Sequence, residues 1–195
     1  KLCLGLISSK EGTIKIFGED IKDTEQKNKI SYISQKSNAF NVSFPATVQE
    51  LIYSSLRSVG YDSKSSKKMT SDAIDLVGIG HIADRRIGNL SGGQQQKAFI
   101  AKAISSKPEI IFLDEPTVGI DYGSEGFFYE AMHMLNQKGV TICMISHDIS
   151  AITSYANRVA CIGEDTFHIH ESNDIMDIET SLKKIYGKKM RLVTH

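Results

Sequence analysis

The chain has 195 residues, and 41% of them are hydrophobic, which is enough for one substantial core and one inserted subdomain. Its 23 Lys and Arg residues balance its 23 Asp and Glu residues, so it lacks the broad basic field by which proteins bind nucleic acid or anionic lipid. It has no apolar run of the roughly 20 residues that cross a bilayer, and its start does not resemble a secretory signal. These features exclude nucleic acid as the first expected partner and predict a soluble chain.

The three cysteines lie inside apolar runs of the sequence. They are Cys3 in KLCLGL, Cys143 in VTICMIS and Cys161 in RVACIG. This placement favours buried, reduced thiols over a disulfide framework or a metal cluster. Because reduced thiols are typical of the cytoplasm, we expect the chain to lie in that compartment.

The first 39 residues predict the end of a helix and then two short strands. The opening run KLCLGL is apolar and ends shortly before Ser8 and Ser9, which is typical of the last turns of a helix. Residues 13–17 and 30–34 are β-prone and are separated by a polar turn that starts at Gly18.

Residues 40–89 predict an inserted helical subdomain. Thr47 and Glu50, three residues apart, have the spacing of a helix-capping box. The apolar residues that follow recur at helical spacing and predict one buried helix face: Val48, Leu51, Ile52, Leu56 and Val59. The polar stretch 62–68 is predicted to be a loop.

Strand and helix patterns alternate after residue 89. Helices are predicted at 92–106, 124–138 and 148–156, and strands at 109–113, 140–145 and 158–162. Such alternation predicts an α/β fold with a mainly parallel sheet and helices on its faces. The core would then comprise residues 1–39 and 90–195.

Four apolar residues at 110–113 precede the acidic pair Asp114 and Glu115. This pattern suits a buried strand that delivers carboxylates to the carboxyl edge of the sheet, where open α/β sheets bind ligands. Because neighbouring strand residues face opposite sides, one carboxylate can organise Mg²⁺ while the other orients a water molecule and accepts its proton. For these six residues alone, a strand that ends in a solvated turn is an equal alternative.

Ser91, Gly92 and Gly93 open the helix predicted at 92–106, and Gln94 is placed to complete a capping box. Free backbone N–H groups, a hydroxyl and the positive end of the helix dipole face outward together at such a start. This arrangement predicts an anion site that suits a γ-phosphate. Taken alone, the same residues also fit an ordinary capped helix.

In combination, these motifs resemble the ABC ATPase family. LSGGQQQK at 90–97, followed by DEPT at 114–117, is similar to the family's signature sequence and Walker B strand. Gln35, after ISYIS, resembles the Q-loop glutamine; His147, in MISHD, resembles the switch histidine; and Asp121, in GID, resembles the D-loop aspartate. The motifs follow the family's order along nearly the whole chain.

The resemblance implies a P-loop NTPase-like (RecA-like) α/β fold and a head-to-tail homodimer that encloses two ATP molecules. Each site would be built from both chains. Ser91, Gly92, Gly93 and Gln94 of one subunit would close over the γ-phosphate held by the other. Asp121 would be a further residue of the nucleotide site.

The resemblance also implies a catalytic arrangement for ATP hydrolysis. Glu115 would polarise the attacking water, and His147 would contact the same phosphate. Asp114 and Gln35 would ligate the Mg²⁺ of MgATP, and Gln35 would report the nucleotide state to the helical subdomain. That subdomain would rest on an integral membrane permease subunit, which places the chain peripherally on the cytoplasmic face of the membrane.

The sequence departs from the family pattern in two places. Lys97 and Lys102 stand where arginines are common after the signature sequence, so any planar arginine contact there is in doubt. The phosphate loop G-x-x-x-x-G-K-[ST] is absent, and the only Gly-Lys pair, Gly187 and Lys188, has no glycine five residues earlier. We therefore expect an N-terminally truncated core with uncovered apolar sheet surface, and a chain that alone neither binds ATP tightly nor hydrolyses it.

Two further segments are similar to ATPases of zinc and manganese importers, namely residues 41–48 and 157–162. This likeness implies a divalent metal ion as cargo and an extracytoplasmic metal-binding protein in the same system. His168 and His170 would share one face of a strand, which permits a low-affinity metal contact or, more simply, a surface strand. The basic tail at 183–191 could contact acidic lipid headgroups or remain solvated.

Two alternative functions remain open. One is a soluble ABC ATPase that acts on ribosomes or DNA, which would call for a second cassette, a long charged linker or a coiled-coil insertion. The other is a non-enzymatic module whose helical subdomain docks a permease. The missing phosphate loop favours the module for this polypeptide, whereas Glu115 and His147 favour an enzyme.

Overall fold

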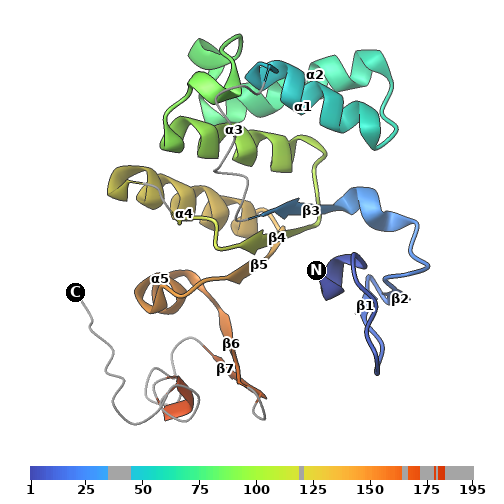
Figure 1. Cartoon of the computed structure of the whole chain (residues 1–195), viewed down its shortest axis with the longest axis vertical. Coiled ribbons are helices and arrows are strands. Elements are labelled where there is room, and N and C mark those ends of the chain that lie inside the picture. Colours follow the sequence, from blue (N-terminus) through green and yellow to red (C-terminus); the bar gives the residue numbers. More distant parts are fainter. Residues whose placement is uncertain (35–44, 119–120, 164–166, 172–177, 179, 183–195) are drawn as a thin grey trace.

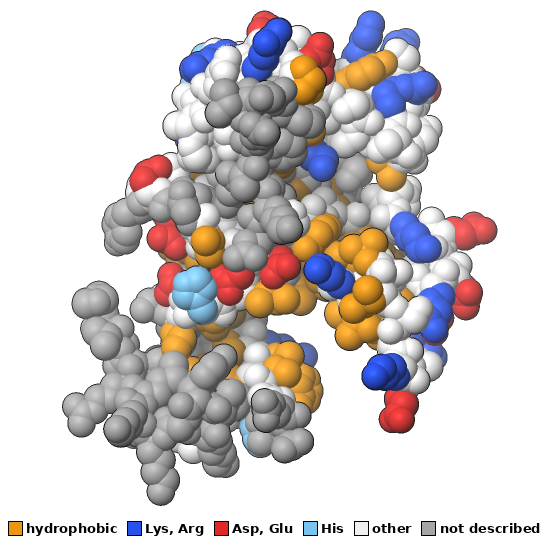
Figure 2. Space-filling view, viewed as in Figure 1, with side chains coloured by type: hydrophobic (Ala, Val, Ile, Leu, Met, Phe, Trp, Pro, Cys, Tyr) orange, Lys and Arg blue, Asp and Glu red, His pale blue; other side chains and the backbone are white. Residues whose placement is uncertain are grey.

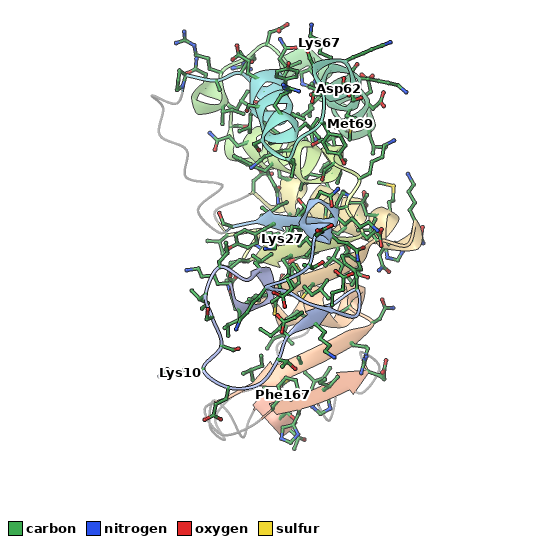
Figure 3. All side chains as sticks on the ribbon, turned by 90° about the vertical axis from the view of Figure 1, so that its right-hand side faces the viewer. Lys10, Lys27, Asp62, Lys67, Met69 and Phe167 are labelled. Carbon is green, nitrogen blue, oxygen red and sulfur yellow. The ribbon has the colours of Figure 1, made fainter. Side chains whose placement is uncertain are left out.

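The computed structural model describes residues 1–34, 45–118, 121–163, 167–171, 178 and 180–182. Figure 1 shows a layer of helices above a parallel sheet, with one small antiparallel sheet near the N-terminus and another near the C-terminus. In the side view of Figure 3, Asp62 and Lys67 lie at the helical end and Phe167 lies towards the opposite end. The sheet therefore lies between the helical layer and the C-terminal strands.

The parallel sheet consists of β3 (Ile30–Ile33), β4 (Ile110–Asp114) and β5 (Thr141–Ile145), in that spatial order. Its register pairs Asp114 with Ile145, so β4 and β5 end together at one edge. Ile111 and Leu113 alternate with less buried residues along β4 and enter the main core. The predicted α/β fold with a parallel sheet is confirmed.

The first long helix, α1 (Val48–Ser58), begins at the predicted capping box. The Glu50 N–H donates to the Thr47 hydroxyl over 3.3 Å, and the Thr47 N–H donates to the Glu50 carboxylate over 2.8 Å. The buried residues of this helix are three of those predicted from helical spacing: Val48, Ile52 and Leu56.

The prediction of a loop at 62–68 was wrong, because α2 spans Ser63–Val77. The Asp62 carboxylate caps this helix by accepting the N–H groups of Lys64 and Ser65, at 2.9 and 3.0 Å. The buried face of α2 begins with Ser66 and Thr70, which are polar. Helical spacing of apolar residues is therefore absent from the first half of the helix.

The third helix of the layer, α3 (Gly92–Ser105), contacts α1, α2 and β3. It is followed along the chain by α4 (Tyr122–Gln137), which contacts α3 and β5, and by α5 (Ile149–Tyr155). One cluster of buried residues runs through α1 to α4, β3 and β4. The division into a core and an inserted subdomain at 40–89 therefore stays a prediction.

The remaining elements are short. β1 (Lys15–Ile16) and β2 (Glu19–Asp20) form a hairpin whose turn residues, Phe17 and Gly18, both have positive φ, as tight hairpin turns require. β6 (Arg158–Ile162) pairs with β7 (Phe167–Glu171) in antiparallel register. Short 3₁₀ turns lie at Leu2–Leu4, Gln26–Lys29, Gly80–Ile82 and Ile87–Asn89.

Apolar side chains are exposed on several strands of the described chain, although only β5 among them belongs to the parallel sheet. Ile145 on β5 is 61% exposed, Ile162 on β6 is 69% exposed and Phe167 on β7 is 62% exposed. Figure 2 shows hydrophobic side chains gathered on the half of the molecule away from the helical layer. Within the described part of the chain, none of the helices combines the length and the apolar character needed to cross a bilayer.

The cysteines only partly match the sequence prediction. All three are free thiols, but Cys3 and Cys143 are exposed and only Cys161 is buried. Cys143 lies on β5 in the same alternating set as the exposed residues Thr141 and Ile145. An apolar run therefore misled the prediction, because one face of β5 is left uncovered among the described residues.

Candidate functional site

Asp114 is the last residue of β4, and Tyr32 of β3 holds its carboxylate. The Tyr32 hydroxyl donates a hydrogen bond to Asp114 Oδ2 over 3.3 Å. Burial raises the pKa of Tyr32, and the nearby Asp114 charge raises it further, so the hydroxyl remains a donor. Sequence analysis missed Tyr32, which lies 82 residues from Asp114, because only the pairing of β3 with β4 brings the two together.

The two predicted catalytic residues, Glu115 and His147, are in direct contact. Glu115 Oε2 lies 2.7 Å from His147 Nδ1, and both residues follow the ends of adjacent parallel strands. The Glu115 N–H also donates to the Ile145 carbonyl over 3.0 Å, which joins the ends of β4 and β5. The fold therefore brings together two residues that lie 32 positions apart in the sequence.

The backbone of Glu115 is strained. Its φ is 48°, in the left-handed region that residues other than glycine rarely adopt. Such strain persists where the surrounding structure imposes it and is concentrated at functional sites. The Glu115 side chain is 21% exposed and that of His147 is 77% exposed, so the pair is accessible from the histidine side.

A depression with a volume of about 440 Å³ lies beside His147. Its walls carry hydroxyl, carboxylate and imidazole groups with one apolar side chain, from Thr117, Val118, Glu125, Ser146, His147 and Asp148. Polar walls of this kind suit a hydrated, polar ligand group rather than an apolar one.

The turn at Ser91 to Gln94 has the predicted capping box. The Gln94 N–H donates to the Ser91 hydroxyl over 3.3 Å, and the Ser91 N–H donates to Gln94 Oε1 over 3.2 Å. Ser91 and Gly92 are exposed, whereas Gly93 is buried. The start of α3 therefore presents Ser91, Gly92 and the positive end of its dipole to solvent, which are features of an anion site.

Two glutamines after this turn are buried, and sequence analysis did not assign them a role. Gln95 Nε2 donates to the carbonyls of Ile87 and Leu90, at 3.1 and 3.3 Å. Gln96 Nε2 donates to the Pro116 carbonyl over 3.4 Å. Gln96 thus connects the start of α3 to the loop that follows Glu115.

Asp121 caps α4 and lies close to the start of α3. Its Oδ1 accepts the Ser124 N–H over 3.0 Å, and its Oδ2 accepts the Ser124 hydroxyl over 2.8 Å. The bonds from Ser124 lower the pKa of Asp121, so the carboxylate is ionised at neutral pH. A Cβ atom added to Gly93 would lie 3.4 Å from Asp121 Oδ2, which places these two predicted nucleotide-site residues side by side.

Lys97 makes a contact that does not need a planar arginine, and Lys102 is partly buried. The Lys97 ammonium lies 4.2 Å from the ring centroid of Phe127 on α4, in a cation–π contact. Lys102 is partly buried, and this burial lowers its pKa.

Of the other predicted residues, Gln35 lies outside the described part of the chain, as does the basic tail at 183–191. His168 and His170 lie on one face of β7 with ring centroids 6.0 Å apart, and His170 Nε2 is 2.9 Å from the Ser181 hydroxyl. Among the described residues, no three or more His, Cys, Asp or Glu side chains gather as a metal site.

A family model of the ABC transporter matches residues 1–118, which include the Ser91 turn and the acidic pair. The chain belongs to the ABC transporter family.

Curated relatives of this ABC chain come from bacterial metal uptake systems. The zinc uptake system ATP-binding protein ZurA of Listeria innocua is 42% identical, over 84% of this chain and 66% of its own length. The high-affinity zinc uptake system ATP-binding protein ZnuC of Bacillus subtilis is 34% identical, over 82% of this chain and 70% of its own length. The manganese transport system ATP-binding protein MntB of Halalkalibacterium halodurans is 30% identical, over 90% of this chain and 71% of its own length. The chain thus spans 66% of the length of ZurA.

Solved structures of other ABC proteins share the fold. A metal-chelate type ABC transporter in an inward-facing conformation superposes with a TM-score of 0.80 at 22% identity, over 95% of this chain and 70% of that one. The structure of cbiO1 from Clostridium perfringens superposes with a TM-score of 0.76 at 20% identity, over 97% of this chain and 77% of that one. These likenesses confirm the predicted P-loop NTPase type of fold.

Proposed function

We propose that this ABC chain is the ATP-binding and ATP-hydrolysing part of a transporter subunit, and that it works as a head-to-tail homodimer. The observation that carries the proposal is the 2.7 Å contact between Glu115 and His147 at the ends of two adjacent parallel strands. A carboxylate and an imidazole at this edge of the sheet can orient a water molecule and contact the phosphate that it attacks.

In this proposal Glu115 orients the attacking water and draws its proton. Its strained backbone and the bond from its N–H to the Ile145 carbonyl fix the direction of the side chain. His147 is more exposed and faces the polar depression, so its free imidazole edge is available to a phosphate oxygen. Phosphoryl transfer of this kind relies on positioning and charge neutralisation rather than on covalent chemistry of the protein.

Mg²⁺ would enter the site with the nucleotide. Proteins usually bind this ion through one or two carboxylates together with substrate phosphates and water, and Asp114 is a carboxylate fixed by Tyr32 at the edge of the sheet. The described residues fit the ion in this limited way, since they supply a fixed oxygen ligand and no full protein cage. Asp114 would hold the ion, with Gln35 as a second oxygen ligand, and the ion would neutralise phosphate charge.

The second half of each site would come from the start of α3 in the other copy. The exposed Ser91 hydroxyl and the N–H groups of Gly92 and Gly93 are proposed to contact the γ-phosphate across the dimer interface. Gln94 keeps the turn in shape through its capping bonds. Asp121, beside Gly93, is proposed to line the same interface.

The chain of 195 residues is proposed to be incompetent on its own. The sequence contains no G-x-x-x-x-G-K-[ST] loop, so the phosphates lack their main backbone cradle and its lysine. Isothermal titration of ATP into this chain is expected to give no binding in the micromolar range. An affinity in that range would contradict this part of the proposal.

The cargo and the partners are proposed from kinship alone. Relatives that are 42% and 34% identical are named for zinc uptake, and one that is 30% identical is named for manganese transport. We therefore propose a divalent zinc or manganese ion as cargo, an integral membrane permease as partner and an extracytoplasmic metal-binding protein in the same system. The chain would then lie on the cytoplasmic face of the membrane.

The experiment that tests the enzymatic proposal uses a longer chain, here named the loop-bearing chain, in which a strand and a G-x-x-x-x-G-K-[ST] loop precede Lys1. We expect this chain to hydrolyse MgATP and to dimerise when ATP is present. The Ser54→Ala variant, which changes an exposed residue of α1 outside the proposed site, serves as a control that keeps most of the turnover. Tight MgATP binding without measurable hydrolysis would contradict an enzymatic role.

A further inference from the structure

The starts of α3 and α4 meet at a contact that only glycine permits. A Cβ atom added to Gly93 would strike the Ser124 hydroxyl oxygen and would lie 2.9 Å from Ser124 Cβ. Gly93 is buried at this point, although it is the second residue of α3 and its neighbours Ser91 and Gly92 are exposed. The side chain of Ser124 therefore sets how closely the two helix starts approach each other.

Ser124 also controls the carboxylate of Asp121. It donates its backbone N–H to one oxygen and its hydroxyl to the other, at 3.0 and 2.8 Å. The same pattern occurs at the start of α2, where Ser65, three residues after Asp62, lowers the pKa of that aspartate through its side chain and its backbone N–H. At Asp121, the hydroxyl bond to the second oxygen fixes the rotation of the carboxylate about its Cβ–Cγ bond.

The Ser124 side chain thus contacts two different neighbours, Gly93 and Asp121. The Ser124 hydroxyl oxygen faces the Gly93 backbone while its hydrogen is directed at Asp121. Any displacement of the turn at Ser91 to Gln94 toward α4 would push on Ser124 and rotate Asp121. The turn and the aspartate cannot move independently at this contact, because protein interiors are close-packed.

We propose that Ser124 is a positioning residue that couples the turn at Ser91 to Gln94 to the carboxylate of Asp121. The functional meaning of this coupling rests on the proposed nucleotide role of that turn. A phosphate that settles on the turn would thereby set the orientation of Asp121 at the dimer interface. Ser124 itself touches neither phosphate nor water in this scheme.

The first test measures the ionisation of Asp121 in the 195-residue chain by carboxyl ¹³C NMR. In the wild type, the titration of Asp121 is expected to shift the amide signals of Gly93 and Gln94 with the same midpoint. In Ser124→Ala, the pKa of Asp121 is expected to rise toward its ordinary value, and the linked shift of the two amide signals is expected to weaken. Ser54→Ala, an exposed serine on α1, is the control and leaves both unchanged.

The second test is a steric rescue that does not depend on any nucleotide. Gly93→Ala is expected to displace the amide signals of the turn and to lower the denaturation midpoint. Adding Ser124→Gly removes the side-chain atoms that the new Cβ would strike. The double variant is therefore expected to recover most of the denaturation midpoint and of the wild-type amide signals. Gly126→Ala is the matched control, because Gly126 lies on the same helix as Ser124 and has open space where its Cβ would be. This variant is expected neither to displace the amide signals of the turn nor to lower the denaturation midpoint.

Two outcomes would overturn the proposal. One is an Asp121 pKa that is the same in Ser124→Ala as in the wild type. The other is a double variant as perturbed as Gly93→Ala alone, since Ser124 would then not be what Gly93 avoids. Neither readout uses ATP, so a failure of the enzymatic proposal would leave both measurements unaffected. The failure of one proposal can therefore be distinguished from the failure of the other.

Discussion

The two halves of the candidate nucleotide site are held by different means. The turn at Ser91 to Gln94 is shaped by bonds between residues three positions apart. The acidic edge depends on contacts across the fold, since Glu115 meets His147 32 positions away and Asp114 meets Tyr32 82 positions away. The turn proposed to bind phosphate is thus formed locally at a helix start, whereas the proposed catalytic groups come together only when the sheet has formed.

This difference predicts that the two halves fail in different ways when they are mutated. Changes at the acidic edge should remove chemistry with little effect on the turn. Changes at the turn should cost local stability in the isolated chain.

Replacing Glu115 by Gln should have the largest effect. In the loop-bearing chain, Glu115→Gln is expected to lower turnover by at least about 10²-fold, because the amide cannot accept a proton from water. ATP binding should persist, and the ATP-bound dimer should accumulate in size-exclusion chromatography. If this variant kept more than a tenth of the wild-type turnover, Glu115 would not be the group that activates water.

Replacing Ser91 by Ala should remove a helix cap. We expect Ser91→Ala to lower the free energy of unfolding of the 195-residue chain by about 1 kcal/mol, measured by urea denaturation. The matched control is Thr47→Ala, which removes the cap of α1 and should cost a similar amount. A loss at Thr47 with none at Ser91 would show that the Ser91 hydroxyl does not hold the turn.

Replacing Glu115 by Gly should relieve the backbone strain. A left-handed residue with a side chain costs about 1–2 kcal/mol, and glycine loses more entropy on folding, so a net gain of about 0.5 kcal/mol in unfolding free energy is expected. Glu109→Gly is the control, because Glu109 precedes β4 and its φ is not positive. That variant should be destabilised, and equal losses in both variants would argue against strain at Glu115.

Replacing Tyr32 by Phe should have the smallest effect, visible only at high pH. The pKa of Tyr32 is raised in the folded chain above its ordinary value of 10.0, so its contribution to stability is present below pH 10 and is lost as the pH rises through the folded pKa. The unfolding free energy of Tyr32→Phe should therefore fall less steeply above pH 10 than that of the wild type. Parallel curves for the two proteins would show that burial and the Asp114 charge do not raise the pKa of Tyr32.

The success of sequence reasoning followed the range of the interactions. The capping boxes at Thr47 and Ser91 and the alternation of strands and helices after residue 89 were predicted, because each depends on neighbouring residues. The parallel sheet followed from that alternation. The family motifs then located Glu115 and His147 without any need to derive their contact.

The features that the sequence did not predict depend on how segments pack together, which neighbouring residues do not reveal. The helix at 63–77 was taken partly for a loop, since the first residues of its buried face are Ser66 and Thr70. Cys143 was expected to be buried because it lies in an apolar run, yet one face of β5 is uncovered in the described chain. Tyr32 and Ser124 could not be assigned, because their roles arise only when distant segments or helix starts meet.

The central claim is that the turn at Ser91 and the acidic edge are halves of a site completed by a second copy of the chain. Pulsed electron paramagnetic resonance on the loop-bearing chain tests this claim directly, with spin labels on Asn89→Cys in one copy and Ser154→Cys in the other, both exposed positions outside the proposed contacts, and with the native cysteines replaced. Together with Glu115→Gln, MgATP is expected to bring the two labels into one short, narrow distance distribution between the copies. A distribution that stays long and broad with MgATP, in a protein that binds the nucleotide, would contradict the claim.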